Sequence, residues 1–279
     1  MSMLKRKGGR YSAPVFVTLI IITAATMVPF LWVIASAFKN NDEIFGSPFL
    51  LPQTWHWDNF ATVWTTGHFW VYFRNSLFVA VMSTIIGVAV ACPAGYAFSK
   101  LRLRQHPALF YIYLFGLTLP IQTTMIPLFY QLKSYGLVDN LWGLIVVLVG
   151  TGTPFGVYLM RNFFRDLADS LIDAARIDGA GEWDVFWRIA LPLSRPAILA
   201  LAVFSFLTAW NEFLLALLLL VSDENRTIPL GLLVFQEANT SDYGALFAAI
   251  VLAMIPSMLV YMLLQRSFTH GLTAGASKE

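Results

Sequence analysis

The segment Ser170–Pro196, SLIDAARIDGAGEWDVFWRIALPLSRP, is a polar stretch between two long apolar runs, and the rest of the chain is interpreted from it. Ser170 and Asp173 have the spacing of a capping box, which predicts a helix over Leu171–Asp178. Gly179 follows at the position where a helix often ends in a left-handed residue. Because so short a helix is unstable alone in water, we expect other parts of the protein to hold it.

The second half of the segment predicts another short amphipathic helix. Asp184 and Arg188 are spaced to pair on its polar side, Pro192 is expected to end it, and Pro196 suits the first turn of the next helix. Periodicity alone leaves two interpretations open: a loop that inserts its aromatic residues into the membrane interface, or a rigid knob at the membrane surface. Its apolar residues recur at i, i+3, i+4 and i+7: Trp183, Phe186, Trp187 and Ala190.

The composition predicts an all-α integral membrane protein. Hydrophobic residues make up 58% of the chain and charged residues 12%, with a mean hydropathy of +0.67, which is outside the range of soluble domains. The Ala35-Ser36-Ala37 sequence in the first apolar run resembles a signal-peptide cleavage site, but the length of that run favours an uncleaved span. Six apolar runs are long enough to cross a bilayer: 15–38, 76–98, 108–132, 141–160, 197–221 and 244–264.

Lysine and arginine orient these spans. Of the 18 basic residues, fourteen lie in alternate segments: the N-terminus 1–14, the stretch 99–107, the stretch 161–196 and the C-terminal tail 266–279. The positive-inside rule therefore predicts that both termini and the 170–196 loop lie in the cytoplasm.

The same loop resembles the "EAA" loop in the membrane subunits of bacterial binding-protein-dependent ABC importers, in its carbohydrate-importer form. The leading glutamate of the family's loop is aspartate here. Weaker resemblances occur in DNFATVW at 58–64, FRNSL at 73–77, AGYAFSKLR at 94–102 and WNEF at 210–213. The matching loop residues are Asp173, Ala174, Ala175, Asp178, Gly179, Ala180, Phe186, Ile189, Leu191 and Pro192.

The resemblance implies a permease subunit with the type I ABC importer transmembrane fold, in the bacterial cytoplasmic (inner) membrane. Such a subunit forms half of a pathway for a sugar or related small solute. Its expected partners are a second homologous permease, an ATPase subunit dimer, an external solute-binding protein and the lipid bilayer, without nucleic acid. The resemblance also implies that the 170–196 loop couples to the ATPase, and that ATP and magnesium are bound by that partner rather than by this chain.

Two further features concern the solute pathway. Trp210, Asn211 and Glu212 lie in the fifth apolar run, and a charge there costs about 2.5–3.5 kcal/mol, so Glu212 should face protein or water. It is interpreted either as part of the translocation path or as half of an Asn–Glu hydrogen-bond clamp between helices. The long external loop carries Trp55, Trp57, Trp64 and Trp70, which suit interfacial anchors or a docking surface for a binding protein.

Several chemistries have no sequence support. There is no G-x-x-x-x-G-K-[ST] phosphate-binding loop, the four histidines lack metal-ligand spacing, and Cys92 is the only cysteine. An ion-coupled secondary transporter is the main alternative function, although one intramembrane acid supports it weakly. An intramembrane enzyme would need a catalytic pair at membrane depth, and none is evident.

Overall fold

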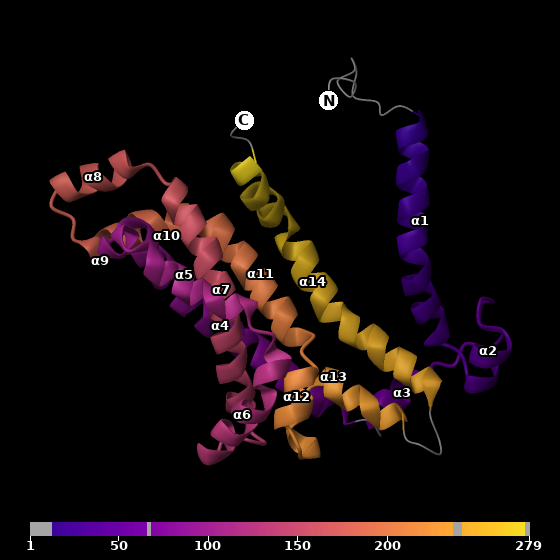
Figure 1. The fold of residues 1–279 in the computed structure, drawn as a ribbon. Helices are drawn as coiled ribbons and strands as arrows, with labels where there is room; N and C mark the ends of the chain where they lie inside the picture. The colour runs from indigo at the N-terminus through magenta and orange to yellow at the C-terminus, as the bar shows by residue number, and fades with distance from the viewer. Residues whose placement is uncertain (1–12, 66–67, 237–241, 277–279) are drawn as a thin grey trace. The chain divides into compact units, whose positions relative to one another are not determined.

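The computed structural model describes residues 13–65, 68–236 and 242–276, and every regular element in those ranges is helical (Figure 1). The longer helices are α1 (Ala13–Ser36), α4 (Phe69–Lys100), α7 (Leu141–Asp166), α11 (Arg195–Trp210) and α14 (Tyr243–Ala276). The shorter ones are α2 (Asn41–Gly46), α3 (Asp58–Thr65), α5 (Pro107–Phe115), α6 (Ile121–Ser134), α8 (Asp169–Ile177), α9 (Glu182–Val185), α10 (Leu191–Leu193), α12 (Leu214–Leu219) and α13 (Ile228–Gly231).

Four described helices are long and apolar enough to cross a membrane: α1, α4, α7 and the Tyr243–Leu263 part of α14. Two bent pairs raise the number to six if each counts as one span. One pair joins Pro107–Thr118 to Ile121–Ser134 at 93°, and the other joins Glu182–Leu193 to Arg195–Trp210 at 75°. The all-α membrane fold expected from composition is therefore confirmed.

The third apolar run is broken where its sequence contains proline. A 3₁₀ turn, Gly116–Thr118, follows α5, and Leu119 is extended with ψ 116° directly before Pro120. A residue before proline avoids the helical region because the proline ring crowds it. Pro120 then stands at the N-cap of α6, where its missing N–H leaves no bond unmade. The break is thus a consequence of the Leu-Pro pair.

The structure corrects one other expected segment. The fifth run is not one continuous helix, because α11 ends at Trp210 and α12 begins only at Leu214. α14 continues through the predicted tail segment as far as Ala276.

The chain divides into two compact units, and residues 1–67 with 234–252 belong to the first. There Lys39 is buried, and its ammonium donates to the carbonyl oxygens of Ser47 and Pro48 at 3.1 and 3.2 Å. The Asn59 amide closes the same turn by donating to the carbonyl of Ala37 at 2.9 Å. Trp55, Trp57, Trp64 and Trp70 are all exposed.

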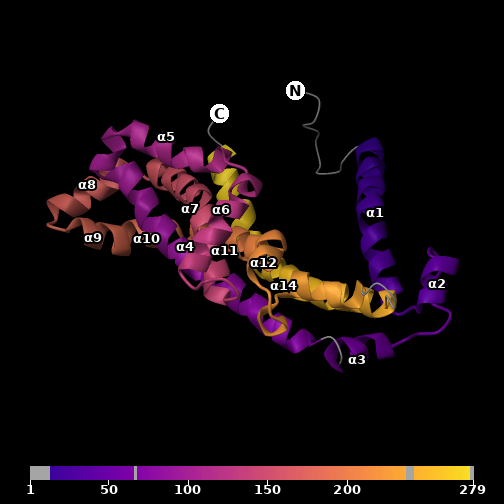
Figure 2. The same cartoon turned by 60° about the horizontal axis from the view of Figure 1, so that its bottom comes forward.

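The second unit comprises residues 68–233 and 253–279, and in it α4, α7 and α11 lie side by side (Figures 1 and 2). Glycine permits close contact at two points. A Cβ on Gly95 would lie 2.7 Å from the Met160 Cβ, and one on Gly156 would lie 2.9 Å from the Ala91 Cβ. Small residues at such crossings let membrane helices approach backbone to backbone. Pro93 lies inside α4 and does not interrupt it.

Three side chains near the N-terminal end of α4 form hydrogen bonds with the first residues of the loop 222–242. The Tyr72 hydroxyl donates to Asp223 Oδ1 at 2.7 Å, and Asn75 Nδ2 donates to the Glu224 carbonyl at 2.7 Å. The Ile228 N–H donates to Ser76 Oγ at 2.8 Å. The start of this loop is therefore attached to the bundle rather than free.

Candidate functional site

The turn between α8 and α9 has the geometry of a Schellman motif. Gly179 has φ +90°, so the prediction of a left-handed glycine there is confirmed. The Ala180 N–H donates to the Ala175 carbonyl at 2.9 Å, and the Gly179 N–H donates to the Arg176 carbonyl at 3.1 Å. Ala175 and Ala180 also pack against the hydrophobic core, which supplies the apolar contact that usually accompanies this motif.

The start of α8 differs from the prediction. The helix begins at Asp169, and Ala168 occupies the N-cap without a side-chain hydrogen bond, so the expected capping box at Ser170 is wrong. Asp169 instead stands in the first turn, where a carboxylate interacts favourably with the helix dipole. It accepts from Lys100 Nζ at 2.5 Å and from Arg104 at 3.1 Å. These bonds, first that from Lys100, hold the pKa of the Asp169 carboxyl below its usual range. Lys100 and Arg104 lie more than 60 residues before Asp169, so no local sequence pattern could have predicted these hydrogen bonds.

A charge bridge spans the glycine turn. Arg176 donates from Nε to Glu182 Oε1 at 3.0 Å and from NH1 to Asp173 Oδ1 at 3.0 Å. Asp173 therefore lies inside α8 and serves as a partner of Arg176, and not at the N-terminal turn as predicted. The Tyr96 hydroxyl donates to Glu182 at 3.4 Å, which connects this bridge to α4.

The second predicted helix is a chain of three short pieces. α9 passes into a π turn over Phe186–Ala190, and α10 follows. Pro192 does not end the helix as predicted, because it occupies the first turn of α10, where a missing N–H costs little. Pro196 does lie in the first turn of α11, as expected. Arg188 and Asp184 form the predicted pair at 3.2 Å.

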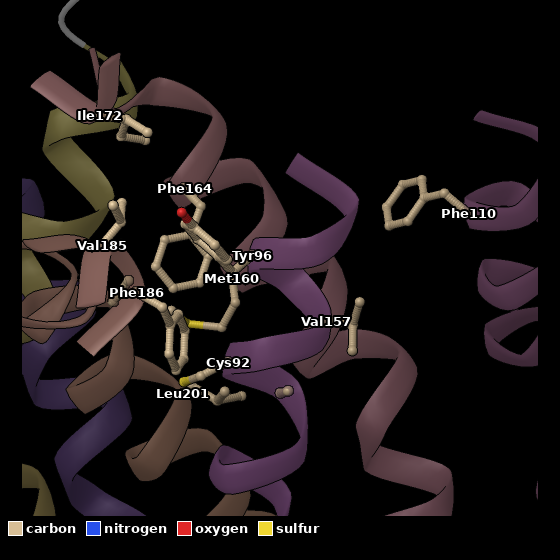
Figure 3. Close-up of a cluster of buried hydrophobic side chains, with 13 residues drawn as sticks. Cys92, Tyr96, Phe110, Val157, Met160, Phe164, Ile172, Val185, Phe186 and Leu201 are labelled. Atoms are coloured by element: carbon tan, nitrogen blue, oxygen red, sulfur yellow. The ribbon is translucent and has the colours of Figure 1, made fainter. Parts of the chain in front are cut away.

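Phe186 anchors this segment in the bundle (Figure 3). Its side chain points toward Tyr96 and Phe164, with ring centroids 5.2 and 6.4 Å away, and it is 4% exposed. Ile172 of α8 and Ala190 of the π turn join the same core. The full set of buried residues in this core is Ala91, Cys92, Tyr96, Phe110, Val157, Met160, Phe164, Ile172, Val185, Phe186, Ala190, Ala197 and Leu201.

Several large apolar side chains of the same segment are exposed. Trp183 and Trp187, predicted to form one apolar stripe with Phe186 and Ala190, are exposed, although their rings contact the Phe186 ring at centroid distances of 5.9 and 5.4 Å. Ile177 is 86% exposed beside the glycine turn. We call the segment 169–193 the knob and its five exposed large apolar side chains, Leu171, Ile177, Trp183, Trp187 and Leu193, the apolar face. Of the predicted coupling residues, Asp173, Ala174, Asp178, Gly179 and Pro192 are exposed, Ala175, Ala180 and Ile189 are half-buried, and Phe186 is buried.

The residues predicted to line a path lie at the break after α11. Trp210 is buried and donates from Nε1 to the Ala253 carbonyl of α14 at 3.1 Å. Asn211 donates to the Leu207 carbonyl of its own helix, and Glu212 Oε1 accepts from the Leu215 N–H at 2.8 Å. The hydrogen bond between helices thus comes from Trp210, and the predicted Asn–Glu clamp is wrong because both side chains bond locally.

Comparison with known proteins decides the family. The sequence pattern of the family described as "Binding-protein-dependent transport system inner membrane component" matches residues 83–273. The chain belongs to this family. It is a permease component of an ABC importer.

Individual relatives agree with the assignment. The permease is 36% identical over 268 residues to the diacetylchitobiose uptake system permease protein NgcG of Streptomyces coelicolor, covering 95% of this chain and 89% of that protein. It is 30% identical to the arabinooligosaccharides transport system permease protein AraQ of Halalkalibacterium halodurans, covering 92% and 93%. A solved bacterial ABC transporter involved in the import of the acidic polysaccharide alginate contains a chain with TM-score 0.79 and 26% identity, covering 94% of the permease and 100% of that chain.

The hydrogen bond of Glu212 predicts how two substitutions at this position will affect the permease. Glu212→Gln keeps an oxygen that accepts from the Leu215 N–H, whereas Glu212→Lys removes the acceptor and leaves a buried N–H unpaired. Losing a cap of this kind costs about 1–2 kcal/mol. We expect Glu212→Gln to assemble and transport nearly as the wild type does, and Glu212→Lys to lose most of its assembled complex. Equal yields and transport for the two variants would contradict this role.

Proposed function

We propose that this permease carries a sugar or a related small solute, together with a second homologous permease, an ATPase pair and an external binding protein. Relatives named for the uptake of diacetylchitobiose and arabinooligosaccharides support a saccharide substrate. A solved alginate ABC transporter in complex with a pentasaccharide-bound periplasmic protein contains a chain of similar fold, with TM-score 0.67, which supports an external binding protein as a partner.

The knob is proposed to be the element that docks on the ATPase. The observation that carries this is its two-sided character: Phe186 and Ile172 are buried in the core, while the apolar face is exposed. Apolar side chains gathered on an exposed surface commonly mark a protein interface. Since the core contains residues of α4, α7 and α11, a displacement of the knob would be passed directly to all three helices.

The orientation follows from the basic residues. Arg104, Arg176 and Arg188 lie on or beside the knob, which the positive-inside rule assigns to the cytoplasm. We expect reporter fusions after Arg104 and Glu182 to report a cytoplasmic location, and fusions after Trp57 and Asn239 an external one. Green fluorescent protein fusions test the cytoplasmic positions, and alkaline phosphatase fusions test the external ones. One inverted result would contradict the six-span topology.

Purification of the complex tests the proposed function directly. With a tag on this chain, we expect an ATPase subunit to co-purify and sugar uptake in proteoliposomes to need ATP and the liganded binding protein. The alternative, an ion-coupled transporter, predicts uptake by this chain alone, driven by a proton or sodium gradient. Gradient-driven uptake without the ATPase would overturn the proposal.

A further inference from the structure

A cavity of about 350 Å³ lies among α4, α7 and α11, apart from the knob. Four hydroxyl side chains line it, Ser83, Thr151, Ser205 and Thr208, together with the rings of Phe155 and Phe204. No charged residue is among its lining residues. Its volume is in the range of pockets that bind small molecules.

Ser83 provides the observation that points to a ligand. Its side chain is only 5% exposed, and its Oγ has no hydrogen-bond partner among the described residues. Buried hydroxyls are almost always paired, because a lone one loses its bonds to water without replacement. Thr151, across the cavity, donates to the Val147 carbonyl at 2.9 Å, so its oxygen lone pairs remain able to accept. A ligand with hydroxyl groups could pair with Thr151, and with Ser83 after its side chain turns to another rotamer, because in the present rotamer its Oγ is enclosed.

Two glycines hold the cavity open. A Cβ added to Gly87 of α4 or Gly152 of α7 would meet no atom within 4 Å, although both residues line the cavity. Gly156, one turn along, differs because it packs against Ala91. Gly87 and Gly152 therefore make no close helix contact, and their lack of a side chain leaves space in the cavity.

We propose that this cavity is a subsite for an uncharged sugar ring, contributed by this chain itself. The Phe155 and Phe204 rings, 5.4 Å apart between centroids, offer an aromatic surface to the C–H groups of a sugar, since an aromatic face carries partial negative charge. The hydroxyl side chains, Ser83 first, bind the sugar's hydroxyl groups. Without a lining cation, the cavity has nothing to balance the carboxylate of an acidic sugar. The proposal rests on the proposed sugar-transport function.

Filling the cavity tests the subsite. We expect Gly152→Leu to lower the uptake of diacetylchitobiose by the reconstituted complex at least tenfold, with unchanged assembly. Gly150→Leu is the matched control, because Gly150 lies on the same helix, also has no atom within 4 Å of an added Cβ, and does not line the cavity. Its uptake should stay within twofold of the wild type.

Removing the unpaired hydroxyl separates binding from stability. Ser83→Ala deletes a buried group that has no partner, so the Tm of the complex should stay the same or rise. The KM for diacetylchitobiose uptake should nevertheless rise about three- to tenfold, the value of one hydrogen bond. An unchanged KM would overturn the subsite.

The remaining outcomes are also decisive. Two results would show that the cavity is instead a packing surface for another helix. One is equal impairment of uptake by Gly152→Leu and Gly150→Leu, and the other is failure of Gly152→Leu to assemble. Either result overturns the subsite. If the wild type prefers an alginate oligosaccharide to diacetylchitobiose, the subsite proposal fails while sugar transport stands. If neither sugar is taken up in an ATP-dependent manner, the proposed function fails, and the subsite fails with it.

Discussion

Gly179→Val is expected to abolish the stimulation of ATP hydrolysis by the liganded binding protein. Gly179 has φ +90°, a backbone conformation in which a β-branched residue is strained by about 1–3 kcal/mol. The knob is short, and the two Schellman bonds at this turn set the direction in which α9 leaves α8. Straining the turn therefore misplaces Ile177 and Trp183 of the apolar face.

Gly181→Val provides the matched control. Gly181 is two residues away, has φ −73° and ψ 164°, and an added Cβ would meet only Asp184 Oδ2, at 3.9 Å. Valine adopts this extended conformation readily. The measurement is ATPase activity of the reconstituted complex with saturating binding protein and sugar. Full stimulation in Gly179→Val, with the complex intact, would mean that the knob is not the coupling element.

Phe186→Ala is expected to have the second large effect. Deleting a buried phenylalanine costs about 3–5 kcal/mol, because the cavity left behind closes only partly. Here the loss falls on the contacts with Tyr96 and Phe164 that attach the knob to α4 and α7. We expect a lower Tm and ATP hydrolysis that no longer responds to the binding protein.

Trp187→Ala distinguishes anchoring from docking. Trp187 contacts the Phe186 ring but is 59% exposed, so its loss should lower the Tm much less than Phe186→Ala does and weaken the binding of the ATPase subunit instead. Thermal unfolding and ATPase titration measure the two quantities. If Phe186→Ala has the same Tm as wild type, the aromatic core does not hold the knob.

The sequence was informative where a single residue has a strong backbone preference. Gly179 predicted a left-handed turn, because glycine tolerates a positive φ without steric cost. Pro196 predicted the first turn of α11, because the proline ring fixes φ at a helical value. Side-chain roles were harder to predict. Trp183 and Trp187 fit the same helical stripe as Phe186, but the buried line runs through Val185, and a π turn shifts the register from Phe186 onward.

Polar partners far apart along the chain were not predictable. Ser170 had the residue type for a cap, yet Asp169 makes the decisive bonds, because Lys100 at the end of α4 and Arg104 in the 3₁₀ turn after it both reach its carboxylate. Likewise, the polar side chains of Asn211 and Glu212 suggested a hydrogen-bond clamp between helices, whereas Trp210 makes the hydrogen bond to α14. Such contacts depend on how the helices pack, and this packing cannot be predicted from the periodicity of a single sequence.

The uninterrupted course of α4 has a mechanical consequence. At one end Tyr72 holds Asp223, and at the other Lys100 holds Asp169 at the start of the knob. At 1.5 Å per residue, its 32 residues form a rod about 48 Å long, so a tilt of about 10° moves one end about 8 Å relative to the other. The helix therefore acts as a lever: a small rotation in the middle of the bundle becomes a large, opposite displacement at its two tips, without any bond in the helix being broken.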